Sequence, residues 1–302
     1  MRIPPDAPAD TPFPMGSSST PFGHRHGPLL DALRGVRWPS RARSRSPNVG
    51  QHASRRRGTS IELTEYRAYR QGDDPRRLDW KLLARTDRAY LRITDERTVL
   101  PTLIAVDASA SMAFPEPGHA KWCQACAIAV GLASLAHAAG DPVGLVVGGP
   151  TPSQLPFQTR RTLLPGLIRT LDAVSPAGTT ELGRLLSGFR NTGRLVVISD
   201  LLGDTTALLQ VASLWRRQAV ELVVAHIVAA EELDPPEAPR VTDPEDPSTV
   251  RTLDAPGRSA YQTAFAAWRA ETARSWQELG ARYLLIDTIE PPAHAVRRIV
   301  AT

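Results

Sequence analysis

After Val99, short apolar runs alternate along the chain with longer stretches whose apolar residues recur at helical spacing. The short runs are rich in β-branched residues and apolar at successive positions, which is typical of strands buried on both faces of a parallel sheet. The predicted strands are 103–106, 143–147, 195–198, 222–228 and 283–286. The predicted helices are 119–139, 162–173, 181–189, 205–218 and 258–279. This alternation predicts βαβ units, and therefore a doubly wound α/β domain with a mainly parallel sheet and helices on both faces.

Changes in composition divide the chain into three parts. Residues 1–50 are rich in Pro, Ser and Arg and poor in apolar residues, so we expect a disordered tail and linker. This part has room for a short amphipathic helical turn over 29–38. We expect residues 51–98 to form a small segment packed on the main domain, which spans 99–302. Within that domain, the prolines and acids of 231–256 fit neither pattern and predict a long surface excursion.

The net charge of +5 is concentrated near the N-terminus. Nine arginines lie between Arg25 and Arg57, against the single acid Asp31, so the basic character belongs to the tail. This leaves open a nucleic-acid-binding protein that works through the basic N-terminal tail. However, no aromatic stacking platform lies near 55–57, and arginine-rich tails are usually solvated, so nucleic acid is not the expected partner.

The apolar runs are also too short for a membrane protein. None approaches the roughly 18 residues that a transmembrane helix needs. The first residues show no charged region followed by an apolar one, as a secretory signal would. We therefore expect a soluble, cytoplasmic protein with no membrane span. Cys123 and Cys126 fall inside the predicted helix 119–139, which favours small buried residues over a redox centre.

Polar side chains with oxygen atoms follow two of the predicted strands. Asp107, Ser109 and Ser111 come directly after the first strand, and Asp200 follows the strand 195–198. Ligands of open α/β sheets bind beyond the carboxyl ends of the strands, so these side chains are expected at one edge of the sheet. Carboxylate and hydroxyl oxygens suit Mg²⁺, or Mn²⁺ or Ca²⁺. The alternative is that the same side chains only cap the start of a helix.

A fifth candidate ligand lies at the start of the predicted helix 181–189. Thr179 and Thr180 both place a hydroxyl there, and Thr180 is followed by Glu181 and Leu182. Asp-x-Ser-x-Ser after a first strand, a later threonine and a later strand-terminal aspartate resemble the metal-ion-dependent adhesion site of von Willebrand factor A domains. We align Thr180 with the family threonine because Thr-Glu-Leu resembles the usual Thr-Asp-Leu, and Thr179 stays as a near alternative.

The resemblance implies a role for each residue of this site. Ser109 and Ser111 would bind the cation directly, and Thr180 would join them in some states. Asp107 and Asp200 would act largely through water. Asp200 is followed by Leu201, where many such domains have glycine, so the sequence departs from the family pattern in that loop.

A second signature precedes the predicted sheet. Tyr69, Gly72, Asp73, Asp74, Arg76, Asp79 and Trp80 form Tyr-x-x-Gly-Asp-Asp-x-Arg-x-x-Asp-Trp. This run resembles the family called domain of unknown function 58 (DUF58), in which it precedes a von Willebrand factor A-like domain, and the resemblance covers 51–302. Here Gly72–Pro75 reads as a turn, and Arg–Asp pairs with buried area from Tyr69 and Trp80 predict a structural clasp against the main domain.

The resemblance also implies a function. Such proteins are commonly paired with MoxR-type AAA+ ATPases and act in the assembly or maturation of other proteins. We expect a non-enzymatic adaptor whose cation accepts an Asp or Glu carboxylate from the ATPase or its client. The alternative is a metal-assisted hydrolase at the same site. That enzyme needs a general base, and the nearby carboxylates, Asp107 and Asp200, are already assigned to the cation. Ser109 also replaces the second aspartate of haloacid-dehalogenase-type enzymes.

Overall fold

The computed structural model describes residues 23–39, 64–71, 73–94, 99–203, 205–236, 238–242 and 250–301. The chain divides into two compact units, residues 45–99 and the remainder, and each is described by itself. The strands of the larger unit are β3 (Thr102–Val106), β4 (Val143–Val147), β5 (Ser153–Gln158), β6 (Arg194–Ser199), β7 (Glu221–Val228), β8 (Ala238–Thr242), β9 (Val250–Leu253) and β10 (Arg282–Asp287). Its α-helices are α1 (Gly23–Ala32), α3 (Ala120–Ala138), α4 (Leu163–Asp172), α5 (Leu182–Leu186), α6 (Thr206–Arg217), α7 (Ala230–Leu233), α8 (Ala255–Glu278) and α9 (Pro292–Val300).

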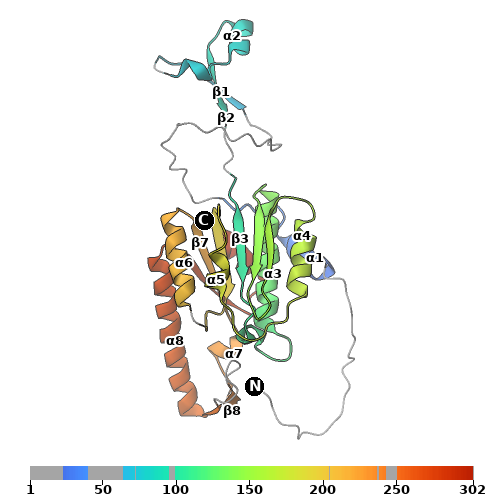
Figure 1. Ribbon diagram of the computed structural model, residues 1–302, viewed down its shortest axis with the longest axis vertical. Coiled ribbons are helices and arrows are strands. Elements are labelled where there is room, and N and C mark those ends of the chain that lie inside the picture. Colours follow the sequence, from blue (N-terminus) through green and yellow to red (C-terminus); the bar gives the residue numbers. More distant parts are fainter. Residues whose placement is uncertain are drawn as a thin grey trace. The chain divides into compact units, whose positions relative to one another are not determined.

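Six strands form one sheet in the order β10-β7-β6-β3-β4-β5 (Figure 1). All neighbours pair in parallel except β4 and β5, which are antiparallel. The chain extends the sheet from β3 through β4 to β5 in one direction, and from β6 through β7 to β10 in the other. The order of strands therefore reverses beside β3. The predicted doubly wound α/β fold is confirmed.

The two faces of the sheet carry separate apolar cores because successive side chains of a strand point to opposite sides. Ile104 and Val106 belong to the core beneath α1, α3, α4 and α9, whereas Leu103 and Ala105 belong to the core beneath α5, α6 and α8. Figure 1 shows α3 and α4 on one side of the sheet and α6 and α8 on the other.

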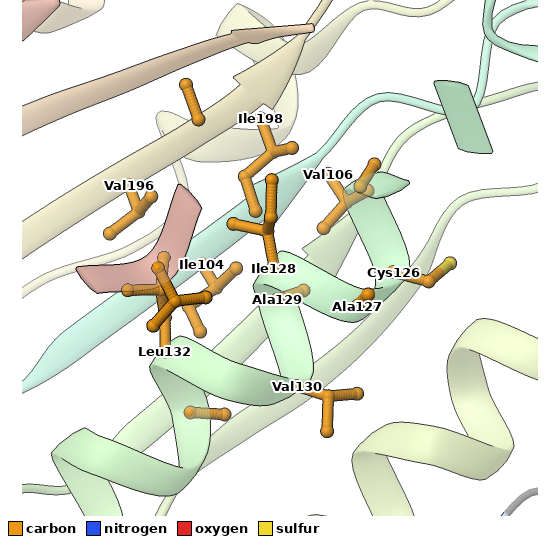
Figure 2. Packing of buried hydrophobic residues seen from close by; sticks show 14 of the residues in the cluster. Ile104, Val106, Cys126, Ala127, Ile128, Ala129, Val130, Leu132, Val196 and Ile198 are labelled. Atoms are coloured by element: carbon orange, nitrogen blue, oxygen red, sulfur yellow. The ribbon is translucent and has the colours of Figure 1, made fainter. Parts of the chain in front are cut away.

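Helix α3 makes the central contact with the first face. Figure 2 shows Ile128 and Leu132 of α3 directed toward β3 and β6, where Ile104 and Ile198 meet them. All four of these side chains are fully buried. Close packing of β-branched and leucine side chains here fixes how α3 lies on the sheet, and α3 begins just after the loop that carries Ser109 and Ser111.

The expectation of disorder is wrong for residues 23–39, and the short helical turn allowed for over 29–38 overlaps the helix that the structure has there. This stretch contains α1, and the side chains of Leu29, Leu33 and Trp38 are buried in the core with α3 and α9. Arg297 of α9 donates a hydrogen bond to the Ala32 carbonyl at 2.5 Å. Three apolar anchors are enough to dock a segment whose overall composition is polar. Residues 1–22 and 40–50 lie outside the described part of the chain, as does the basic run 55–57.

Some regular elements were not predicted. Strand β5 contains Pro156 and polar residues and alternates in burial, as is typical of an edge strand rather than a central one. Helix α9 is short and carries two arginines on its exposed side. The expected excursion 231–256 leaves the sheet after β7, and its described part contains most of α7 and the antiparallel pair β8 and β9.

The smaller unit pairs β1 (Thr64–Ala68) with β2 (Tyr90–Thr94) in antiparallel orientation. A 3-10 helix (Pro75–Arg77) and α2 (Trp80–Thr86) lie between them in sequence. Asp73 accepts hydrogen bonds from the Arg67 guanidinium and the Arg70 backbone, both at 2.8 Å, and Asp79 caps α2. Within this unit Trp80 is 63% exposed and α2 buries no residue, so the expected burial of Trp80 against the main domain stays a prediction. Gly72 lies outside the described residues.

Candidate metal site at the carboxyl ends of β3 and β6

Two of the predicted ligands, Asp107 and Asp200, lie at neighbouring strand ends where the strand order reverses. Strands β3 and β6 are parallel neighbours, so Asp107 and Asp200, which follow them, emerge at the same edge of the sheet. The Asp107 backbone N–H donates to the Ile198 carbonyl at 2.9 Å, which continues the sheet pairing up to the site. This is the position at which open α/β sheets bind ligands.

Asp107 is a buried carboxylate held by neutral donors. Its Oδ1 accepts the Ser109 backbone N–H at 2.9 Å, and its Oδ2 accepts the Ser199 hydroxyl at 2.6 Å. Only 4% of the residue is exposed. Burial, followed by the charge of Asp200, raises the pKa of Asp107 to about 6. Among the described residues Asp107 has no cationic partner.

Ser109 and Ser111 present their hydroxyls to each other. The two Oγ atoms lie 3.1 Å apart, and both residues are buried. The 3-10 helix Ala110–Ala113 turns the chain so that alternate side chains converge. Two backbone hydrogen bonds, Ala110 N–H to the Gly178 carbonyl and Ala177 N–H to the Ala108 carbonyl, hold the loop before Thr180 against this turn.

Thr180 and Thr179 differ in burial. The Thr180 hydroxyl oxygen is buried and has no hydrogen-bond partner among the described residues, whereas Thr179 is exposed. Both residues line a pocket of about 500 Å³ together with Asp107 and Ser109. The remaining walls come from the start of α5 and the start of α6. A buried hydroxyl without a hydrogen-bond partner raises the free energy of the folded state, and coordination to a hard cation would compensate for the missing partner.

Asp200 is engaged by a residue that the sequence did not single out. The ammonium of Lys121 lies 2.7 Å from Asp200 Oδ2 and 2.7 Å from Glu232 Oε1. Asp200 Oδ1 accepts the Leu202 backbone N–H at 3.3 Å. Burial alone would lower the pKa of Lys121, but the attraction of Asp200 and Glu232 is stronger and raises it, so this lysine is charged.

The residue after Asp200 adopts the backbone conformation that glycine favours. Leu201 has a φ of 57°, in the left-handed region, and is 3% exposed. Its backbone N–H donates to the Ser199 hydroxyl at 2.9 Å. A leucine in this conformation costs about 1–2 kcal/mol, which its burial offsets. Leu201, which stands where many related domains have glycine, therefore still adopts the left-handed backbone conformation in this loop.

The donor set fits a hard divalent cation. The carboxylates of Asp107, Asp200 and Glu232 carry three negative charges against the one positive charge of Lys121, which leaves a net charge of −2 in a largely buried place. The described residues contain no group of three or more His, Cys, Asp or Glu side chains that suits a metal. Hydroxyls would have to supply part of the coordination of any ion held here, which would favour Mg²⁺, Mn²⁺ or Ca²⁺ over a softer ion.

Sequence reasoning missed Lys121, Glu232 and Ser199. Lys121 is the only Lys, Arg, Asp or Glu residue of the largely apolar helix α3, and a charged residue in that setting was the available signal. Glu232 lies in the acidic stretch after β7, where nothing distinguishes it from its neighbours. Its partner Lys121 is 111 positions away in the sequence.

These features define a doubly wound α/β domain with a polar, oxygen-rich site at its strand-reversal point. The chain belongs to the family described as protein of unknown function DUF58, which matches residues 65–271. Uncharacterized protein Rv1480 of Mycobacterium tuberculosis is 30% identical over 270 residues, covering 84% of this chain and 83% of that protein. Uncharacterized protein Mb1516 of Mycobacterium bovis gives the same values.

Two solved structures are reported as neighbours of this chain. Conserved hypothetical protein BatB from Bacteroides thetaiotaomicron has a TM-score of 0.42 and 14% identity, covering 67% of this chain and 97% of that chain. The SpRpn10 VWA domain has a TM-score of 0.35 and 14% identity, covering 66% of this chain and 94% of that chain. None of the helices in the described part of this chain has the length and apolar character of a membrane-spanning segment.

Proposed function

We propose that this protein is a non-enzymatic protein-interaction module with a von Willebrand factor A-like domain, and that a divalent cation at its strand-reversal point makes binding metal-dependent. One observation carries the proposal. The buried carboxylate of Asp107 has no cationic partner among the described residues and lies in the loop that presents the paired hydroxyls of Ser109 and Ser111. Buried charge of this kind is normally paired or bound to a metal.

Each residue has a defined task in this proposal. Ser109 and Ser111 hold the cation directly, and Thr180 adds its unpartnered hydroxyl. Asp107 and Asp200 compensate its charge and orient bound water. Mg²⁺ is the ion that we propose, with Mn²⁺ or Ca²⁺ as alternatives. When bound, such an ion supplies an open coordination position that accepts an Asp or Glu carboxylate of another protein.

The pocket beside the hydroxyls supports this use of the site. Its volume of about 500 Å³ gives room for an acidic side chain and its neighbours, and Arg184 and Thr205 stand in its lining. We propose a MoxR-type AAA+ ATPase or its client as the partner, acting in the assembly or maturation of other proteins in the cytoplasm. The family resemblance supports that choice.

A metal-assisted hydrolase at the same site receives less support. Such an enzyme needs a general base beside a metal-bound water. Both oxygens of Asp107 and both oxygens of Asp200 already accept hydrogen bonds from the protein. These hydrogen bonds hold both carboxylates in place, and in this proposal both serve the cation, so neither is assigned as the base.

Isothermal titration calorimetry with Mg²⁺ and Mn²⁺ tests the metal site. Wild-type protein is compared with the double variant Ser109→Ala, Ser111→Ala, and circular dichroism confirms that both are folded. We expect saturable binding to the wild type and its loss in the variant. Absence of binding to folded wild-type protein would contradict the metal site.

Partner binding is tested separately. A purified MoxR-type ATPase from the same organism is immobilised, and binding of wild-type protein is measured by surface plasmon resonance in Mg²⁺ and in EDTA. We expect binding in Mg²⁺ that EDTA abolishes, and no binding by the double serine variant. Equal binding in Mg²⁺ and in EDTA would show that partner recognition does not depend on the metal.

A further inference from the structure

Lys121 is a cation buried beside the candidate metal site. Its side chain is fully buried, and its ammonium contacts Asp200 and Glu232, whose side chains are 2% and 13% exposed. The third contact is the ring of Phe114, whose centroid lies 5.7 Å from Nζ. Two carboxylates and an aromatic ring therefore contact the ammonium, which favours a positive charge at this position.

The place of Lys121 in its helix supports the same reading. Lys121 is the second residue of α3, in the first turn, where the helix dipole disfavours positive charge. No acidic residue in that turn offsets the cost. The compensation comes from Asp200, which follows β6, and Glu232, which follows β7. The lysine therefore links α3 to two strand ends of the candidate site.

The Lys121 ammonium already pairs with the carboxylate of Asp200, for which a divalent ion at this site would have to compete. Asp200 Oδ2 is held by Lys121, and Oδ1 by the Leu202 backbone. Asp107 differs from Asp200 in having no cationic partner among the described residues, so Asp107 and the three hydroxyls form the side that an added ion would approach. Without Lys121, the three carboxylates would carry a charge of −3 instead of −2, and a dication would be attracted more strongly.

We propose that Lys121 is an internal cation that limits the affinity of this site for divalent metal by neutralising Asp200. This inference rests on the proposed metal-binding function and names the residue that tunes it. Glu232 has the opposite effect, because it shares the ammonium and adds negative charge. Its Oε2 also accepts the Ala229 backbone N–H at 2.8 Å, which fixes its position.

Three variants change the charge of this cluster in a graded way. Lys121→Met makes it −3, Glu232→Gln makes it −1, and the double variant restores −2. The control is Glu221→Gln. Glu221 is likewise 13% exposed and paired with a fully buried cation, Arg194, but it begins β7 at the opposite edge of the sheet. The Glu221→Gln substitution therefore removes a carboxylate of similar burial and pairing at a position far from the site.

Calorimetric titration of Mg²⁺ and Mn²⁺ into each full-length protein measures the effect, and circular dichroism checks folding. We expect Lys121→Met to bind about tenfold more tightly and Glu232→Gln about tenfold more weakly than wild type. The double variant is expected within about threefold of wild type, and Glu221→Gln at the wild-type value.

The outcomes separate this inference from the proposed function. Weaker or unchanged binding by folded Lys121→Met would overturn the inference and leave the metal site intact. If Lys121→Met does not fold, the test rests on Glu232→Gln. Unchanged metal affinity in that variant would overturn the inference, and weaker metal binding in Glu232→Gln but not in Glu221→Gln would support it. If wild type binds no metal but Lys121→Met or the double variant does, Lys121 excludes the ion and only the proposed function fails. If no variant binds, both fail.

Discussion

A Cβ atom placed on Gly148 would lie 2.0 Å from the hydroxyl oxygen of Thr180. The hydroxyl therefore occupies the space that a side chain would take at the end of β4. The Gly148 backbone N–H donates to the Val106 carbonyl at 2.8 Å, so this glycine also adjoins the end of β3. The absence of a side chain at position 148 is what lets the threonine loop reach the strand ends.

Gly148→Ala is expected to destabilise the fold and weaken metal binding. The added methyl must push Thr180 away, and overpacking of this kind costs about 1–3 kcal/mol. Urea denaturation measures the free energy of unfolding, and calorimetry measures the affinity for Mg²⁺. Gly166→Ala is the matched control, because a Cβ there meets no atom within 4 Å and α4 gains a better helix former. Equal stability of Gly148→Ala and wild type would show that Thr180 does not depend on this space.

The two neighbouring threonines are expected to differ in their contribution to the site. Thr180→Val keeps the shape but removes the buried unpartnered hydroxyl, so we expect metal affinity to fall about tenfold, as for loss of one ligand interaction of 1–2 kcal/mol. Thr179→Val removes an exposed hydroxyl and is expected to leave affinity unchanged. Calorimetry on both variants decides the matter. A loss confined to Thr179→Val would assign the ligand to Thr179 instead.

The metal-free protein is expected to lose stability between pH 4 and pH 6 because of Asp107. Its pKa is about 6 in the folded protein and 3.8 ordinarily, so the folded state keeps a proton that the unfolded state releases. Stability from this group is therefore present below pH 4 and lost as pH rises to 6, by about 3 kcal/mol in total.

Urea denaturation in EDTA across this pH range measures the effect against Asp107→Asn, which does not titrate. The difference in unfolding free energy between the two proteins is expected to change by that amount, and the comparison removes the contribution of other groups. Added Mg²⁺ is expected to reduce the loss in the wild type, because a cation favours the ionised carboxylate. Parallel pH profiles of wild type and Asp107→Asn would contradict the raised pKa.

Much of the larger unit follows from local sequence pattern. Strands such as 103–106 and 195–198 are buried on both faces, so each is apolar at every position and is recognisable by itself. Because parallel strands align their carboxyl ends, the sequence alone predicts that Asp107 and Asp200 lie at one edge of the sheet. Strand β5 could not be identified in this way, since Pro156 and its polar neighbours reflect an edge position that only the assembled sheet defines.

The contacts that complete the candidate site could not be predicted from local pattern. Lys121 reaches Asp200 across 79 positions and Glu232 across 111, and no periodicity reports such pairs. The docking of α1 could not be predicted for the same reason. Leu29 and Leu33 are recognisable as core residues only from their packing with α3 and α9, which are distant in the sequence. The average composition of residues 1–50 is polar, and an average of this kind does not reveal the few apolar residues that pack into the core.

Trp38→Ala is expected to destabilise the larger unit strongly. Its ring lies 3.8 Å from the Arg194 guanidinium carbon, and its side chain is 5% exposed. Arg194 is itself fully buried, contacts Glu221 at 3.2 Å and donates to the Pro39 carbonyl at 3.1 Å. Removing the ring leaves a cavity and uncovers a buried ion pair, so the unfolding free energy should fall by about 3–5 kcal/mol.

Urea denaturation of the full-length protein measures this loss, and Arg37→Ala serves as the control because Arg37 is exposed one residue away. Its unfolding free energy should stay within about 0.5 kcal/mol of wild type. Trp38→Phe keeps an aromatic face over Arg194 and should recover part of the stability. If Trp38→Ala unfolds like Arg37→Ala, residues 23–39 are a dispensable tail after all; if it unfolds as predicted, the domain begins well before β3, because its core requires the segment that carries α1.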